Sequence, residues 1–300
     1  MQLKPRAVGG VAEAVDAVSQ SDVNALVDEY YGKYDICLEG RDPEEFKNHV
    51  AVQAQIELGF ERFLEEKNYQ AIVTHFGDLG ALKQLPGLAI QRLLADGYGF
   101  GAEGDWKTSA LVRTFKAMTA GQVVEGKKGN AFMEDYTYNL VAGKEANMGS
   151  HMLEVDPEIA VSKPKIEVHH LGIGDKEPPA RMVFNTLEGE GLVAAVVDMG
   201  NRFRCVVNEI NVIKPEAPLP KLPVARMLWK PYPSLSTSAE AWILAGGGHH
   251  TAFSNIITTE MLQDWSEMVG IECVAIGKDT TIPAFRNELR WNAAYWGAKR

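Results

Sequence analysis

The stretch "GLVAAVVDMGNRFRCVVNEINVI" (191–213) decides the fold of the second half of the chain. It holds two runs rich in β-branched residues, separated by Gly200 and Asn201, residue types that favour turns. "KIEVHHLGI" (165–173) and "RMVFNTL" (181–187) repeat this composition just upstream. Several short strands at close spacing predict an antiparallel barrel or sandwich in this region.

The first half of the chain alternates between helical and β-rich patterns. Asp42 is suited to cap a helix that begins with a proline, and apolar residues then recur at helical spacing to about residue 67. "QAIVTHF" (70–76) is β-rich, and "LPGLAIQRLLADGYG" (85–99) predicts a second helix ended by glycine. Asp105 is suited to cap a third helix. This alternation predicts an α/β layer.

Two breaks divide the rest of the chain. "EGKKGN" (125–130) is polar and glycine-rich, and we place a domain boundary near residue 128, which gives domains at 1–128 and 129–300. Residues 215–233 contain six of the 14 prolines, which favours an extended arm rather than a sheet strand. Beyond this arm the pattern returns to mixed α/β.

The composition excludes several classes of protein. With 46% hydrophobic residues among 300, the chain can bury a substantial core. A net charge of -10 argues against nucleic-acid binding, which needs clustered Lys and Arg. No run approaches the roughly 20 apolar residues of a membrane span. The three cysteines are scattered, so we expect a protein of the reducing cytoplasm without a disulfide framework.

"GFGAEG" (99–104) matches the GxGxxG pattern of dinucleotide-binding proteins. That fingerprint requires a strand leading into the first glycine, whereas residues 85–98 follow a helical pattern. We therefore prefer a glycine-rich turn between two helices. A nucleotide-binding module remains a rival interpretation, and it predicts a strand before Gly99.

Four acids and histidines could hold a cation, although each also has an ordinary structural interpretation. Glu103 lies among glycines, where a carboxylate is most often solvated, and Glu134 lies in an apolar stretch, where it needs a partner. His151 is by default a hydrogen-bonded core residue. Together with His250, these residues would suit Mn²⁺ or another octahedral metal better than zinc. Spacing alone supports this site only weakly.

Two pairs of adjacent histidines, His169–His170 and His249–His250, raise the question of which side chain reaches a site. Consecutive side chains of an extended chain point to opposite faces. We therefore expect at most one histidine of each pair to reach a given site. In "GGGHHT" the side chains of His249 and His250 should therefore point away from each other, and the one that does not reach the site should hold the turn.

The phrases that carry these residues resemble L-arabinose isomerases. They occur in family order along nearly the whole chain: "DVNALVDEY" (22–30), "LKQLPGLAIQRLLADGYGFGAEGDWKT" (82–108), "FMEDYTY" (132–138), "GSHMLEV" (149–155), "LPKLPVA" (219–225) and "AWILAGGGHHTAFS" (241–254). The resemblance implies a single Mn²⁺ per subunit, with Co²⁺ or Mg²⁺ as alternatives. It implies these roles: metal ligands Glu103, Glu134, His151 and His250; acid and base Glu103 and Glu134; substrate contacts Phe76 and His249.

The resemblance also implies an activity. Family members interconvert L-arabinose and L-ribulose through a cis-enediol, with D-galactose to D-tagatose as a side activity, in cytoplasmic arabinose catabolism. They are homo-oligomers and carry a further N-terminal α/β domain that helps to build the oligomer. A metal- or sugar-binding remnant without catalysis is the alternative function.

The expected fold class is therefore α/β. It comprises a partial Rossmann-like central domain at 1–128 and a C-terminal antiparallel β-barrel domain with flanking helices at 129–300. We expect the active site between the two, because ligand-bearing loops fall on either side of the boundary.

Overall fold

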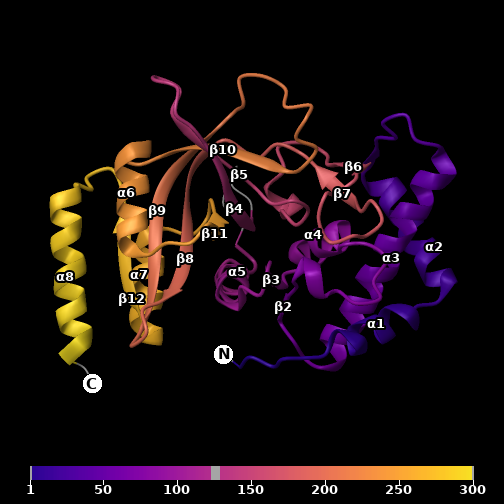
Figure 1. The fold of residues 1–300 in the computed structure, drawn as a ribbon, viewed down its shortest axis with the longest axis horizontal. Helices are drawn as coiled ribbons and strands as arrows, with labels where there is room; N and C mark the ends of the chain where they lie inside the picture. The colour runs from indigo at the N-terminus through magenta and orange to yellow at the C-terminus, as the bar shows by residue number, and fades with distance from the viewer. Residues whose placement is uncertain (1, 123–128, 299–300) are drawn as a thin grey trace.

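A computed structural model describes residues 2–122 and 129–298, apart from the side chains of residues 135 and 136 (Figure 1). Its helices are α1 (Val8–Asp16), α2 (Gln20–Lys33), α3 (Pro43–Glu66), α4 (Gly87–Ala95), α5 (Trp106–Met118), α6 (Leu235–Ala245), α7 (Thr259–Val269) and α8 (Ile282–Ala298), with short 3-10 turns η1 (Phe76–Asp78) and η2 (Pro157–Ile159). None of the described helices is long and apolar enough to cross a membrane.

The strands of the described residues belong to three sheets. A small parallel pair joins β2 (Ala71–Val73) to β3 (Gly99–Gly101), and a second sheet has the order β1 (Asp35–Ile36), β6 (Lys165–Val168), β7 (Ala180–Val183). The largest sheet contains β4 (Asn130–Asn139), β5 (Ala146–Ser150), β8 (Gly189–Asp198), β9 (Phe203–Ile213), β10 (Arg226–Pro231), β11 (His250–Ser254) and β12 (Glu272–Ile276).

The first half of the chain is an α/β layer, as its alternating pattern predicts. Asp42 caps α3 by accepting the backbone N–H groups of Glu44 and Glu45. The parallel strands β2 and β3 lie beside α4 and α5, which makes a partial Rossmann-like unit. Helices α1, α2 and α3 lie at the end of the molecule opposite α8 (Figure 1). The predicted domain boundary at residue 128 falls outside the described residues.

The second half contains a closed antiparallel barrel with flanking helices. Its strand order is β10-β5-β4-β11-β8-β9, and the pairing of β10 with β9 closes the ring. The β8–β9 hairpin pairs residues from Gly189 opposite Val212 to Asp198 opposite Phe203, so residues 191–213 form the turn and two strands that their composition predicts. Outside the ring, β12 adds to β9 in parallel, and α6 and α7 contact this edge.

The proline-rich segment at 215–233 differs from our expectation of an extended arm. Residues Arg226–Pro231 form β10, the strand that completes the barrel between β5 and β9. Its prolines lie at 215–223 and 231–233, which leaves residues 226–230 with free N–H groups for the ladder. A proline at the end of a strand removes no interior ladder bond, so a proline count over the whole segment was misleading.

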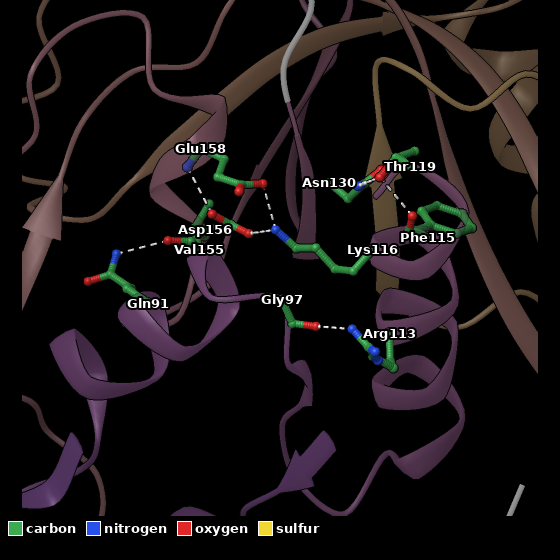
Figure 2. A network of polar contacts seen from close by, with 10 residues as sticks. All are labelled: Gln91, Gly97, Arg113, Phe115, Lys116, Thr119, Asn130, Val155, Asp156 and Glu158. Carbon is green, nitrogen blue, oxygen red and sulfur yellow. Dashed lines mark hydrogen bonds and ion pairs between the residues drawn. The ribbon is translucent and has the colours of Figure 1, made fainter. Parts of the chain in front are cut away.

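A buried network of polar contacts joins the two halves of the chain (Figure 2). Lys116 of α5 bonds to Asp156 and, over 2.7 Å, to Glu158 of η2. Nearby, the Asn130 amide donates to the Thr119 hydroxyl over 2.8 Å. These contacts hold α5 against the barrel and thereby position the turn that precedes α5.

Candidate active site

The turn between β3 and α5 carries Glu103. A Cβ atom at Gly99 or Gly101 would lie 2.4 Å from the Ser109 carbonyl or 2.2 Å from the Asp105 carbonyl, so only glycine allows β3 to pack so closely on α5. Glu103 itself has a φ of 54°, in the left-handed region. The turn therefore exposes the Glu103 carboxylate next to the closely packed start of α5.

The environment of this turn decides between the two interpretations of "GFGAEG". The element before Gly99 is helix α4, and no strand leads into the first glycine, as the nucleotide-binding interpretation would require. The preferred helix-to-helix turn was only partly right, because Gly99–Gly101 form the short strand β3, paired with β2. The glycines therefore serve close packing between a strand and a helix.

Barrel register brings three of the predicted ligands together. His250, the first residue of β11, lies opposite Glu134 of β4. Glu134 in turn lies opposite Ser150 of β5, the residue before His151. The ring centroids of His151 and His250 are 5.9 Å apart. Residues separated by up to 116 positions thus meet at one rim of the barrel.

Both buried histidines are held at Nδ1 by a carboxylate. The Nδ1 atom of His250 lies 3.4 Å from Asp105 Oδ2, and that of His151 contacts Glu154. The Nε2 atom of His250 is buried and has no hydrogen-bond partner among the described residues. Carboxylate contact at one ring nitrogen fixes the imidazole tautomer and leaves the other nitrogen available as a metal ligand.

The electrostatics follow from these contacts. Burial raises the pKa of Asp105, but hydrogen bonds from His250 and Thr108 outweigh it and bring the pKa to about 2. Burial lowers the pKa of His151, and the negative charges of Glu154, Glu134 and Glu103 outweigh it and raise the pKa. The site therefore carries a negative field that favours a cation.

His249 departs from the expectation that it points away from its neighbour. Ligand atoms of Glu103, His249 and His250 all lie within 4.8 Å of one another, and His249 Nε2 lies 3.8 Å from Glu134 Oε1. The prediction for this pair was wrong because His249 lies in a bend and β11 begins only at His250. The alternation rule applies to extended backbone alone. His249 remains exposed and faces the same cluster.

The glycines before the pair determine the shape of the loop. Gly246 ends α6 with a φ of 84°, a left-handed cap. Gly247 lies against Trp242, whose ring a Cβ would meet at 2.4 Å, and the Trp242 indole N–H donates to the Gly248 carbonyl over 2.9 Å. This packing fixes the loop that presents both histidines.

A hollow of about 310 Å³ opens beside these residues. It is lined by Glu103, Gly104, Asp105, Lys107, Thr108, Ala195, Val196, Val197, Gly248 and His250. Phe76, the predicted substrate contact, is not part of this lining; its ring stacks on His75 with centroids 4.7 Å apart. Lys107 and Asp105 also line the hollow. Neither was predicted from the sequence as a substrate contact, because nothing in the local sequence indicates that role.

The residues present fit a divalent cation. Two carboxylates and up to three imidazoles converge, with no cysteine among them, which suits Mn²⁺, Co²⁺ or Mg²⁺ better than a structural zinc site. The buried Nε2 atom of His250 has no hydrogen-bond partner among the described residues. Burial of such a polar atom costs free energy unless a ligand binds to it.

Comparison with known proteins matches both halves of the chain to one family. Residues 1–121 match the model of the L-arabinose isomerase central domain, and residues 129–272 match that of the L-arabinose isomerase C-terminal domain.

Individual relatives agree with this match. The chain is 53% identical over 293 residues to an L-arabinose isomerase of Anoxybacillus flavithermus, and 55% identical over 289 residues to one of Geobacillus stearothermophilus. It is 50% identical over 295 residues to one of Salmonella enteritidis. These alignments cover 96–98% of this chain but only 57–58% of the relatives, so the chain spans little more than half of their length.

Proposed function

Because the chain belongs to the L-arabinose isomerase family through its central and C-terminal domains, we propose that it interconverts an aldose and a 2-ketose. The proposed substrates are L-arabinose and L-ribulose, with D-galactose to D-tagatose as a side activity. We extend the proposal to a homo-oligomer that acts in cytoplasmic arabinose catabolism.

The observation that carries the proposal is the paired arrangement of histidines and carboxylates at the barrel rim. Asp105 and Glu154 hold the Nδ1 atoms of His250 and His151, and the Nε2 atom of His250 lacks a partner among the described residues. We propose that Glu103, Glu134, His151 and His250 hold a Mn²⁺ ion, with Co²⁺ or Mg²⁺ as alternatives. A bound ion would supply Lewis-acid polarisation of the sugar carbonyl.

The two glutamates have the chemistry for the proton transfers. Conversion of an aldose to a 2-ketose moves a proton from C2 to C1 and another from the O2 hydroxyl to O1. A carboxylate can take the C2 proton and return it to C1 of the cis-enediol, while the second relays the proton between the oxygens. Glu134 is half-buried and Glu103 is exposed, so the two differ in their access to solvent.

Asp105 and Glu154 are positioning residues in this proposal. Each holds one imidazole in a fixed tautomer and orientation, so that its second nitrogen faces the rim. His249 and Phe76 are proposed substrate contacts. The 3.8 Å between His249 Nε2 and Glu134 Oε1 supports the role proposed for His249, whereas Phe76 would have to reach the sugar from η1.

The test is ketose formation from L-arabinose with added Mn²⁺, for the wild type and for Glu134→Gln. We expect turnover to fall by about 10²-fold or more, because a positioned acid or base contributes that much. Glu145→Gln is the matched control, because Glu145 is an exposed glutamate in the connection between β4 and β5, directly before β5. Equal turnover of wild type and Glu134→Gln would refute the assigned role.

Calorimetry with Mn²⁺ and with L-arabinose should accompany this assay, because it measures binding separately from catalysis. Binding of both ligands without turnover in the wild type would favour a metal- and sugar-binding protein over an isomerase.

A further inference from the structure

A second cluster of metal-ligating side chains lies away from the barrel rim, where β1 meets β6. These strands pair in parallel, with Asp35 opposite Lys165 and Ile36 opposite Ile166. The pairing continues for one more residue, because the Cys37 N–H donates to the Ile166 carbonyl over 3.0 Å. Cys37 therefore lies level with Glu167.

Two further ligand types lie close to this position in the sequence. Glu39 follows Cys37 by two residues, and His169 follows Glu167 by two residues. Glu39 lies in a turn with a φ of 47°, and this turn returns its carboxylate to the Cys37 side chain. Two neighbouring segments thus bring a thiol, two carboxylates and an imidazole together.

The contacts agree with this register argument. Ligand atoms of Cys37, Glu39 and Glu167 lie within 4.8 Å of one another. The Cys37 thiol donates to Glu39 Oε1 over 3.2 Å. His169 Nε2 lies 2.7 Å from Glu167 Oε2. All four side chains are thereby linked into one group.

No cation of the described residues is in direct contact with the carboxylates of this group. Glu167 is only 8% exposed, and no Lys or Arg of the described residues lies within ion-pair distance of Glu167 or Glu39. Arg181, opposite Glu167 on β7, acts on its charge from a greater distance, while its guanidinium donates to the Met152 and His169 carbonyls. A bound metal ion would give the buried carboxylate a cation in direct contact.

We propose that Cys37, Glu39, Glu167 and His169 form a binding site for Zn²⁺. One sulfur, one nitrogen and two carboxylate oxygens make up the four ligands that zinc takes in tetrahedral sites. Binding replaces the thiol proton of Cys37, which is released to solvent, so that the thiolate bonds to the metal. Glu39 is exposed and gives the ion a route of entry.

This site would have a structural role distinct from that of the barrel rim. Cys37 and Glu39 belong to the segment matched by the central-domain model, whereas Glu167 and His169 belong to that matched by the C-terminal-domain model. The ion would therefore cross-link the two halves of the chain at the β1–β6 pair.

The test uses Co²⁺ as a probe, because a thiolate bound to Co²⁺ gives a charge-transfer absorption in the near ultraviolet that a site of carboxylates and imidazoles lacks. The whole chain is titrated with Co²⁺ in excess Mn²⁺, which occupies the barrel-rim ligands. We expect the absorption to saturate at one Co²⁺ per chain, to reverse with added Zn²⁺ and to disappear in Cys37→Ser.

A matched pair of histidine variants tests the ligand set. His169→Asn should weaken Co²⁺ binding by about tenfold or more, whereas His170→Asn, at the exposed neighbouring position, should leave it unchanged. Circular dichroism verifies that each variant folds. Absence of the absorption in the wild type, or its persistence in Cys37→Ser, would overturn the proposal, as would equal effects of the two histidine variants.

Discussion

Two buried polar clusters of this protein differ in how completely their atoms are paired. At the junction of the two halves, Lys116 lies between Asp156 and Glu158, and all three charges have partners (Figure 2). At the barrel rim, His250 is equally buried, yet its Nε2 atom has no partner among the described residues. A satisfied cluster can stabilise the fold by itself, whereas an unsatisfied one indicates a ligand.

The junction network is connected well beyond its central cation. The Glu158 N–H donates to Asp156 Oδ1 over 2.8 Å, and the Gln91 amide donates to the Val155 carbonyl over 3.0 Å. Lys116 and Asp156 are almost fully shielded from solvent, with side-chain exposures of 5% and 0%. Loss of the cation would leave a buried carboxylate that water cannot reach.

Lys116→Met should therefore have the largest effect of the changes considered. It keeps much of the side-chain length but removes the charge, and stranding a buried partner in this way costs about 3–5 kcal/mol. Urea unfolding of the two proteins measures the difference. Lys163→Met is the control, because Lys163 and Asp35 form an exposed pair at 3.0 Å, for which we expect less than about 1 kcal/mol. Equal losses in the two variants would contradict a special role for the junction.

At the barrel rim we expect a substitution to remove the stabilisation that a bound ion provides, and to change the stability of the metal-free protein little. At a Mn²⁺ concentration 100 times the dissociation constant, a single site stabilises the wild type by about 2.7 kcal/mol. His250→Asn should lose this gain, while the metal-free variant unfolds within about 1.5 kcal/mol of the wild type, because Nε2 has no protein bond to lose.

Thermal unfolding with and without MnCl₂ measures both quantities. His170→Asn is the control and should keep the full metal-dependent shift. A shift of the same size in His250→Asn would show that the stabilising ion binds elsewhere.

Local signals in the sequence were sufficient to predict much of the fold. Asp42 and Asp105 cap α3 and α5 as expected, and residues 191–213 form the long barrel hairpin. A barrel was expected, but the strand that closes it was not, because β10 is flanked by prolines and pairs with β5, far away in the sequence, as well as with β9. Such pairing depends on tertiary contacts, which composition does not reveal.

The two polar clusters also differ in what the sequence reveals. The histidines and glutamates of the rim were recognisable through the phrases that contain them. The direction of His249 was not, because it depends on whether β11 begins at residue 249 or 250. Nothing local distinguishes Lys116 from an exposed helical lysine, since its partners lie 40 and 42 residues away.

The pH dependence of the Lys116→Met penalty, at most about 1.4 kcal/mol for each pH unit, is the sharpest test of the comparison. Burial raises the pKa of Asp156 to about 6, even though Lys116 acts to lower it. Without Lys116 the pKa of Asp156 in the folded protein must rise further, so the variant takes up a proton at a pH where the wild type does not.

A carboxyl group whose pKa is higher in the folded protein than in the unfolded chain contributes stability that is lost as the pH rises. The variant should lose this stability over a wider pH range than the wild type. Below about pH 6 Asp156 is protonated in both folded proteins, so the penalty should be nearly constant there; it should grow from pH 6 to pH 8, by up to about 1.4 kcal/mol per pH unit. Urea unfolding at pH 5, 6, 7 and 8 measures this slope against Lys163→Met, which should show none. A constant penalty would mean that Asp156 finds another cation in the variant, and that the junction is less completely determined by Lys116 than its contacts indicate.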